Sequence, residues 1–308
     1  MVKVRTMKSG YVSLIGRPNA GKSTLLNTMV GAKVAIVSDK PQTTRGRILG
    51  VKNYPDGQIV FVDTPGIHRP LHRLNVRMVD AAVETLREVD VVALIFDAST
   101  KPGHGDQFVT TLLEKVRSPI VLVLNKIDLV QKATLLPLIE RVQQWRQFAA
   151  IVPVSAQTGD GVDRLERVLL EQLPEGESLY PEDYLTDQPE RTLVAETVRE
   201  KILHHTRAEL PFSTAVVVDK FDEEERERML RLYCTIFVEH DSQKAIVIGR
   251  GGEMIKRIGT EARKDLEEAF ETRVFLDLRV KVNPDWRNDD RALDDLGVPR
   301  TARKPKRR

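Results

Sequence analysis

The sequence has one cysteine, no long apolar run and no leader segment, and each lack excludes a class of protein. Because Cys234 is the single cysteine among 308 residues, no internal disulfide forms, which fits a reducing compartment. Apolar runs such as residues 91–96 are far too short to cross a bilayer, and the charged residues 1–8 contain no apolar core of a secretory signal. We therefore expect a cytoplasmic protein in which Cys234, inside the apolar run 232–238, is a buried hydrophobe and not a nucleophile.

The composition is that of a globular chain with an unusual end. Hydrophobic residues make up 41% and charged residues 30%, which is enough for a core, and 308 residues exceed one typical domain. The net charge of +3 is mild, but basic residues crowd the last nine positions: Arg300, Arg303, Lys304, Lys306, Arg307 and Arg308. This basic tail either contacts an anionic polymer or is a solvated segment without a partner.

One stretch has the pattern of a phosphate-binding loop. The octet GRPNAGKS at residues 16–23 follows the apolar run 11–15 and precedes the helix-like run 24–30. With this spacing, backbone N–H groups wrap a pyrophosphate at the start of a helix, Lys22 reaches the outer phosphates and Ser23 holds Mg²⁺. The flanking strand and helix favour this interpretation over a merely structural glycine turn. The expected phosphate contacts are Asn19, Ala20, Gly21, Lys22, Ser23 and Thr24.

A long polar segment at residues 32–45 follows that helix. A loop of this length inside a compact domain is usually functional or mobile, so we interpret it as a switch that senses the nucleotide. Thr44, or failing that Thr43, would offer its hydroxyl to Mg²⁺. The β-like runs 47–54 and 58–62 come next, and the Pro-Asp-Gly turn between them predicts a hairpin. One edge of the sheet is therefore expected to be antiparallel.

The second run of this hairpin ends in the sequence DTPG at residues 63–66. Alone, DTPG is an ordinary turn, but beside a phosphate loop it is typical of a Walker-B aspartate. Asp63 would hold Mg²⁺ through water, and the Gly66 amide would bind the γ-phosphate, because glycine permits close backbone approach. The expected magnesium ligands are Ser23, Thr44 and Asp63, and the groups expected to act in catalysis are Lys22, Thr44 and Gly66.

The strand-like run 120–124 leads into the sequence NKID at residues 125–128, a pattern that reads guanine. Asp128 would accept hydrogen bonds from N1–H and the exocyclic amino group of guanine, which adenine lacks. Each charge-assisted bond contributes about 1.5–3 kcal/mol, so two of them discriminate against ATP by about a hundredfold or more. Asn125 is expected to brace this loop, and the aliphatic part of Lys126 to lie along the base. A backbone amide of the pair Ser155 and Ala156 is expected to bind guanine O6.

Strand and helix patterns alternate through the first part of the chain. We expect strands at residues 11–15, 91–97, 120–124 and 151–154, and helices at residues 24–30, 76–87, 106–116 and 161–173. Ligand motifs follow several of these strands directly. The pattern predicts a doubly wound α/β domain with a mostly parallel sheet over residues 1–173.

The remaining chain is organised differently. Residues 174–189 are rich in proline and acids and are interpreted as a linker. A second domain is expected over residues 190–285, with an extension over 286–308 that includes the basic tail. In the second domain we expect helix 190–209, strand 214–220, a charged turn, strand 231–240, two helices and strand 274–282.

Between the last two of these strands lies the sequence GRGG at residues 249–252. A lone G-x-x-G is weak evidence for RNA binding, because the pattern is common in helix–helix turns. Here it opens an amphipathic helix within the order α-β-β-α-α-β, which matches an α+β type II KH domain, whose glycine loop clamps the backbone of single-stranded RNA. The expected RNA contacts are Lys244, Gly249, Arg250, Gly251, Gly252, Lys256 and Arg257.

The motifs together resemble the translation-factor class of small GTPases. Residues 16–23, QTTR at residues 42–45 and PEDY at residues 181–184 resemble the Era branch, and a GTPase domain followed by a KH domain extends the resemblance over nearly the whole chain. The resemblance implies binding of GTP and GDP and hydrolysis of GTP. It also implies binding of the single-stranded 3′ end of 16S ribosomal RNA and a role in maturation of the small ribosomal subunit. We expect a monomer.

The resemblance also includes one departure, one implied cation site and one competing function. Ile67 stands where Ras-like members have a glutamine that orients the attacking water, so we expect slow intrinsic hydrolysis. K⁺-activated members carry an asparagine at the position of Asn19, which implies a K⁺ site; the alternative is an Asn19 that only bonds its own loop. The family is also associated with the inner membrane face. The competing function is therefore a GTP-switched RNA-binding module in peripheral contact with the membrane, in which hydrolysis is of minor importance.

Overall fold

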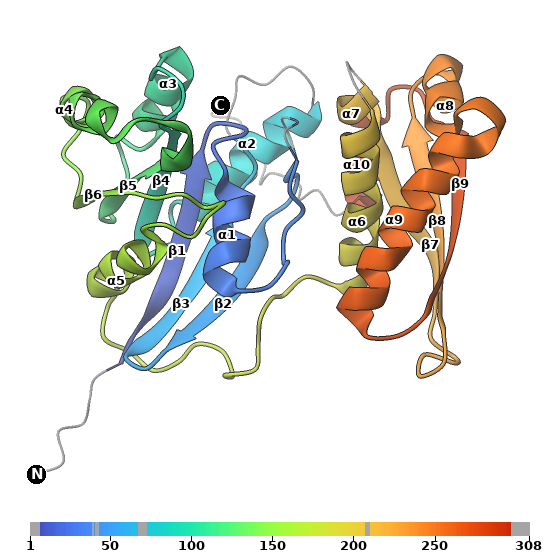
Figure 1. Cartoon of the computed structure of the whole chain (residues 1–308), viewed down its shortest axis with the longest axis horizontal. Coiled ribbons are helices and arrows are strands. Elements are labelled where there is room, and N and C mark those ends of the chain that lie inside the picture. The colour runs from blue at the N-terminus through green and yellow to red at the C-terminus, as the bar shows by residue number, and fades with distance from the viewer. Residues whose placement is uncertain (1–6, 39, 41–42, 67–72, 207–209, 297–308) are drawn as a thin grey trace, which may run out of the picture.

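The structure, a computed structural model, describes residues 7–38, 40, 43–66, 73–206 and 210–296. Figure 1 shows two sheets, each with its own helices, lying side by side; the linker, in yellow-green, crosses between them. No helix within those ranges has the length and apolar content needed to cross a membrane.

The first half is a six-stranded sheet with helices on both faces. Its elements are β1 (Lys8–Gly16), α1 (Lys22–Val30), β2 (Ile48–Tyr54), β3 (Gly57–Asp63), α2 (Arg73–Thr85), β4 (Val91–Asp97), α3 (His104–Leu112), β5 (Ile120–Asn125), α4 (Leu135–Gln143), β6 (Ala150–Pro153) and α5 (Val162–Gln172). The strand order is β2-β3-β1-β4-β5-β6, and all pairs are parallel except β2 with β3. The expected antiparallel edge is confirmed. Side chains of α1 and α5 pack on one face of the sheet, and those of α2, α3 and α4 on the other.

This topology places the sequence motifs together. Strands such as β4, with the sequence VVALIFD, are continuous apolar runs because a parallel strand of this kind is buried on both faces. Because β1, β3, β4 and β5 run parallel, the carboxyl ends of β1, β3 and β5 lie at one edge of the sheet. The phosphate loop, Asp63 and the sequence at residues 125–128 follow these three strands directly, as expected for ligand sites in doubly wound folds.

Some helices of the first half differ from the sequence-based expectation. No helix was predicted at α4; its Pro137 lies in the first turn, where no intrahelical N–H is required. The helix α2 begins at Arg73 and not at residue 76. The helix α3 ends at Leu112 and not at residue 116, because the chain tightens there, with the Leu113 amide donating to the Thr110 carbonyl.

The second half contains the predicted order α-β-β-α-α-β and two further short helices that were not predicted. Its elements are α6 (Glu190–His205), α7 (Leu210–Ser213), β7 (Ala215–Asp222), β8 (Leu230–Val238), α8 (Asp241–Ile248), α9 (Glu253–Phe270), β9 (Val274–Val282) and α10 (Asp290–Asp295), of which α7 and α10 are the two further helices. The strand β8 pairs antiparallel with β7 and parallel with β9, and α6, α8 and α9 pack on one face of this sheet. The helix α6 ends at His205, whereas a helix to residue 209 was expected. Cys234 is 1% exposed, as predicted, and burial raises the pKa of its thiol to about 12.

The other face of the small sheet is covered by residues 286–296, for which the sequence predicted no helix. Trp286 is 1% exposed and donates its indole N–H to the Ser213 carbonyl at 3.0 Å. It lies in one apolar cluster with Leu293 of α10 and with Leu74 and Met78 of α2. Because α2 belongs to the first half, this cluster joins the two halves of the molecule.

Replacing Trp286 by alanine should therefore lower the free energy of unfolding by about 3–5 kcal/mol, the usual cost of removing a buried aromatic ring. Urea unfolding followed by circular dichroism measures this change. Phe275→Ala is the matched control, since Phe275 is 46% exposed and its loss should cost far less. Equal costs for the two variants would contradict the packing role of Trp286.

The linker is attached to the large sheet along its length. The Val51 amide of β2 donates to the Leu185 carbonyl at 2.8 Å, and the Thr186 hydroxyl donates to the Leu49 carbonyl at 2.6 Å. The rings of Tyr180 and Tyr184 stack with centroids 4.8 Å apart against the same strand. The linker therefore covers the open edge of β2, which would otherwise present unpaired backbone groups.

Candidate functional site

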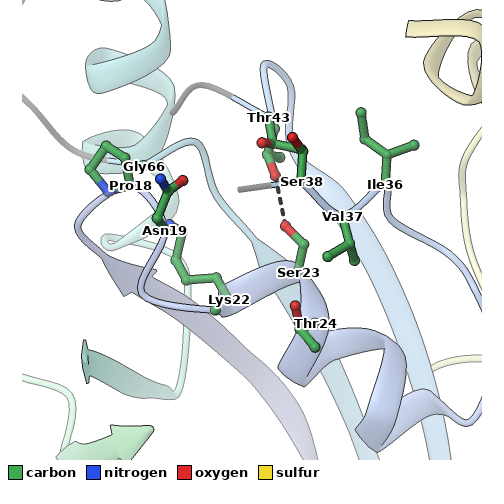
Figure 2. Close-up of a pocket in the computed structure, with 12 residues that line it drawn as sticks. Pro18, Asn19, Lys22, Ser23, Thr24, Ile36, Val37, Ser38, Thr43 and Gly66 are labelled. Atoms are coloured by element: carbon green, nitrogen blue, oxygen red, sulfur yellow. Dashed lines mark hydrogen bonds between the residues drawn. The ribbon is translucent and has the colours of Figure 1, made fainter. Parts of the chain in front are cut away.

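The phosphate loop and the polar segment after α1 face each other across a small cavity of about 50 Å³. Figure 2 shows Lys22 and Asn19 on one wall and Val37, Ser38 and Thr43 on the other. The loop contributes Pro18, Asn19, Gly21, Lys22, Ser23 and Thr24, and the polar segment contributes Ile36, Val37, Ser38, Thr43 and Thr44. The expected phosphate contacts other than Ala20, which is buried in the core, thus line one site with residues 36–38, 43 and 44 of the expected switch.

Three side-chain oxygens from three segments converge beside the loop. The Ser23 hydroxyl donates to Asp63 Oδ2 at 2.8 Å and lies 2.9 Å from the Thr44 hydroxyl, which in turn donates to Asp63 Oδ2 at 3.2 Å. Asp63 Oδ1 is buried and has no hydrogen-bond partner among the residues that the structure describes. Thr43 instead bonds the Lys40 carbonyl. The geometry therefore selects Thr44 over Thr43, and this set of hard oxygen donors fits Mg²⁺.

The same site buries one charge of each sign. Burial raises the pKa of Asp63, although Lys22 and the hydrogen bonds from Ser23 and Thr44 oppose the shift. Burial lowers the pKa of Lys22, and Asp63 opposes that shift. The Lys22 ammonium donates to the Arg17 carbonyl at 3.1 Å, inside the loop. A bound anion at the loop and a cation at Asp63 would satisfy both charges.

The segment after β3 comes very close to the phosphate loop. A Cβ atom at Gly66 would lie 2.8 Å from Pro18 Cα, so only glycine fits at this contact. The approach places Gly66 beside the phosphate loop, and the binding of the γ-phosphate by its amide stays a prediction. Ile67, the residue in place of the water-orienting glutamine, lies outside the described residues.

The side chain of Asn125 connects the phosphate loop to the base-reading segment. It donates to the Ala20 carbonyl at 2.9 Å and accepts the Ala156 amide at 2.9 Å, the bracing that was predicted for it. Asp128 accepts the Ser155 hydroxyl at 2.5 Å. The Ser155 amide donates to the Asp160 carbonyl, so both expected backbone amides already have acceptors in the protein. A guanine carbonyl placed here would share or replace one of them.

The glycine loop of the second half connects α8 to α9. Gly252 has φ 82°, and a Cβ atom there would meet no atom within 4 Å, so the backbone lies open to a ligand. Arg250, Lys256 and Arg257 are exposed around it, and Ile246 is 54% exposed. Open backbone, basic side chains and an apolar surface are the features that bind single-stranded RNA. The remaining expected contacts, Lys244, Gly249 and Gly251, belong to the same α8–loop segment.

Known proteins match both parts of the chain. Residues 11–126 match the family described as 50S ribosome-binding GTPase, and residues 209–287 match the KH domain family. GTPase Era of Geobacter metallireducens is 49% identical over 290 residues, which cover 94% of this chain and 97% of that protein. The chain belongs to the Era family of GTPases. GTPase Era of Heliobacterium modesticaldum is 47% identical and covers the same shares of the two chains.

Two solved structures resemble this Era-family GTPase over nearly its whole length. The crystal structure of Era in complex with MgGDPNP and nucleotides 1506–1542 of 16S ribosomal RNA has a TM-score of 0.92 at 41% identity, covering 95% of this chain and 99% of that one. A variant of Aquifex aeolicus Era bound to GDP and AlF4⁻ has a TM-score of 0.91 at 41% identity, with the same coverage. The expected fold class, a doubly wound GTPase domain followed by a type II KH domain, is confirmed.

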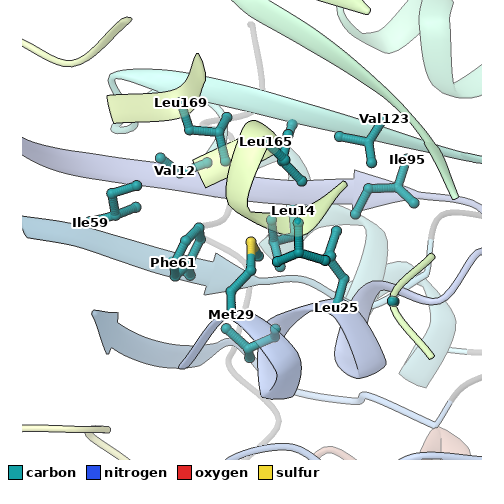
Figure 3. Close-up of a cluster of buried hydrophobic side chains, with 14 of the residues drawn as sticks. Val12, Leu14, Leu25, Met29, Ile59, Phe61, Ile95, Val123, Leu165 and Leu169 are labelled. Carbon is teal, nitrogen blue, oxygen red and sulfur yellow. The ribbon is translucent and has the colours of Figure 1, made fainter. Parts of the chain in front are cut away.

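The sites of the GTPase rest on tightly packed side chains. Figure 3 shows Leu14 of β1 and Phe61 of β3 against Leu25 and Met29 of α1, and all four are fully buried. Leu165 of α5 closes the same cluster. Because interiors of this density deform little, the loops after β1 and β3 are held in fixed relative positions.

The sequence-based prediction missed Asp97 of the GTPase. Its carboxylate receives the Lys126 ammonium at 2.6 Å; burial would raise the pKa of Asp97, but hydrogen bonds from Lys126 and Ser99 lower it. Lys126 itself has φ 66°, a left-handed backbone rare outside glycine. The ion pair fixes the Lys126 side chain against the carboxyl end of β4. An acid at the carboxyl end of β4, next to β5, was the available signal.

Proposed function

We propose that this GTPase couples its nucleotide state to the binding of a single-stranded RNA, and that the RNA is the 3′ end of 16S ribosomal RNA. Hydrolysis is assigned to residues 1–173 and RNA binding to residues 190–285, joined by residues 174–189. The relative crystallised with MgGDPNP and an RNA of this kind supports the assignment, since it is similar to this chain along both parts. The role that follows is maturation of the small ribosomal subunit by a cytoplasmic monomer.

The chemistry proposed for the first part is attack of water on the γ-phosphate of GTP. Lys22 and the backbone amides of residues 19–24 bind the β and γ phosphates and stabilise the charge that develops on them. Ser23, Thr44 and Asp63 would hold Mg²⁺, which neutralises phosphate charge when bound. The Gly66 amide orients the γ-phosphate. Asn125, Lys126, Asp128, Ser155 and Ala156 form the guanine pocket.

A monovalent cation at Asn19 is proposed as the substitute for a missing catalytic side chain. Asn19 has φ 62° and lines the same cavity as Ser38 and Lys22, so its side chain belongs to the region where the phosphates of GTP are expected. K⁺ sheds water more readily than Na⁺. A positive charge in this region, as in an arginine finger, raises the rate about 10³-fold or more in related enzymes.

Hydrolysis by the wild type should accordingly be at least about tenfold faster in KCl than in NaCl. This is a fraction of the rate increase that a positive charge in this region gives in related enzymes. The Asn19→Ala variant should lose this difference. Single-turnover hydrolysis at matched ionic strength measures both. Equal wild-type rates in the two salts would refute the K⁺ site.

The observation that carries the proposed function is the pair of built sites in one chain: the Ser23–Thr44–Asp63 oxygen cluster and the open glycine loop at 249–252. Crosslinking of a labelled single-stranded RNA in the presence of GTP, GDP or no nucleotide tests the coupling. The yield is expected to depend on the nucleotide. The same yield in all three states would contradict it.

The alternative of a membrane-surface module with little hydrolysis is not favoured. The similar proteins of known structure carry nucleotide analogues and, in one case, ribosomal RNA. Peripheral membrane contact would depend on the basic tail at residues 300–308, which lies outside the described residues. Flotation of the protein with anionic liposomes tests that contact.

A further inference from the structure

The helix α6 of the KH half contacts the switch segment of the GTPase half directly. The Val37 amide donates to Glu200 Oε1 at 2.9 Å, and the Val37 carbonyl lies 3.1 Å from His204 Nε2, the next residue along the same helix face. Both backbone polar groups of Val37 are therefore bonded to α6. Val37 also lines the cavity that contains Lys22 and Thr44.

Glu200 is the centre of a group of alternating charges. Its side chain is 3% exposed, and Oε2 receives the Lys33 ammonium at 2.6 Å. Lys33 also lies 3.0 Å from Asp265 of α9, the helix that begins at the glycine loop, and Lys201 lies 2.5 Å from the same carboxylate. Burial would raise the pKa of Glu200, but the bonds from Lys33 and the Val37 amide lower it, so the carboxylate stays ionised. A buried carboxylate with these partners holds its geometry strongly.

A second contact from α6 holds the other end of the switch segment. The Arg199 side chain, which is 1% exposed, donates to the Thr43 carbonyl and is fixed on its own helix by Glu196. Thr44 follows Thr43 directly, and its hydroxyl is hydrogen-bonded to the side chains of Ser23 and Asp63. Residues 33, 37 and 43 of the switch segment are thus all contacted from the KH half, and the last two line the wall of the cavity opposite the phosphate loop.

We infer that Glu200 of the KH half is a positioning residue for GTP hydrolysis. Through the Val37 amide and Lys33 it fixes the switch segment so that Thr44 remains on the Ser23–Asp63 pair. This inference rests on the proposed role of Thr44 as a magnesium ligand. Glu200 itself touches no reacting group, so it acts on the rate only through the segment that it holds.

Loss of Glu200 should slow hydrolysis but leave nucleotide binding nearly unchanged. GDP is held by the phosphate loop and the guanine pocket, which Glu200 does not contact, so GDP affinity should stay within about twofold. The single-turnover rate should fall about tenfold or more, the effect expected from losing a charge-assisted hydrogen bond that holds the reactive geometry. The Mg²⁺ concentration that half-saturates hydrolysis should rise, because Thr44 is no longer fixed.

The experiment compares Glu200→Ala, Glu200→Gln and Glu190→Ala in the full chain. The glutamine variant keeps an acceptor for the Val37 amide and should recover part of the rate. Glu190 is the matched control, since it is an ion-paired glutamate on the same helix whose partner is Arg226. Hydrogen exchange of the peptide that contains Val37 supplies a readout independent of catalysis, and it should accelerate in Glu200→Ala alone.

Unchanged hydrolysis and exchange in Glu200→Ala would overturn the inference, as would an equal loss in Glu190→Ala. Thermal unfolding of each variant separates a general loss of fold from a local one. The Thr44→Ala variant separates this inference from the function on which it rests. If Thr44→Ala still hydrolyses GTP normally, the role of Thr44 is wrong; if it is inactive while Glu200→Ala is normal, only the positioning role is wrong.

Discussion

Replacing Asp128 by asparagine should weaken GTP binding by about a hundredfold or more, since two charge-assisted hydrogen bonds to guanine are lost. The same change should strengthen binding of XTP. The amide N–H of asparagine would donate to the 2-oxo group of xanthine, which the carboxylate repels. The Ser155 hydroxyl, which now donates to Asp128 at 2.5 Å, would keep an oxygen acceptor, so the local structure should persist. Competition between GTP and XTP for a fluorescent guanine nucleotide measures the exchange of preference.

Asp160→Asn is the matched control for this variant. Asp160 is an exposed acid of the same segment, and its described contact with Ser155 uses the backbone carbonyl, which the substitution retains. The control should therefore keep the preference for GTP. An unchanged preference in Asp128→Asn would remove Asp128 from the guanine pocket.

Replacing Gly252 by aspartate should reduce RNA affinity by about a hundredfold or more while leaving GTP affinity intact. At φ 82° a side chain brings backbone strain of roughly 1–2 kcal/mol. The space around Gly252 is open, so the new carboxylate would stand where RNA phosphates must pass and would repel them. Binding of a labelled single-stranded RNA, with nucleotide affinity measured on the same sample, tests both halves of the expectation.

Gly159→Asp controls for strain alone. Gly159 also has φ 82° with no atom within 4 Å of an added Cβ, but it lies in the GTPase half. It should therefore leave RNA binding unchanged. If Gly252→Asp bound RNA at the wild-type level, the glycine loop would not be the RNA site.

The large sheet was predictable from sequence because its central strands are continuous apolar runs bounded by ligand motifs. The helix α4 was not predicted, although its apolar residues recur at helical spacing and Pro137 falls in the first turn, where proline is tolerated. The helix α10 has no comparable signal. Its sequence is mostly charged, and Trp286 and Leu293 are buried only because α2 and β7 come to meet them, a contact that local periodicity does not encode.

The nucleotide motifs were predictable because each is a short contiguous stretch with a known geometry, although the roles of their residues stay predictions. The preference for Thr44 over Thr43 had little support in the sequence, because neighbouring residues in an irregular segment have no periodicity to separate them. Glu200 carried no signal either. A buried ionised glutamate and a solvated one look alike in sequence, and its partners Lys33 and Val37 are far from it along the chain.

The attachment of the linker to β2 limits how the two halves can move. The chain stays bonded to the sheet as far as Asp187, whose carboxylate accepts the Leu49 amide at 3.3 Å, and α6 begins at Glu190. Only Gln188 and Pro189 remain between them, and the proline ring fixes one backbone angle and restricts the residue before it. Any reorientation of the KH half that preserves this attachment must therefore turn about one short, stiff hinge. Such a turn would move the glycine loop at residues 249–252 along an arc centred on residues 188–189.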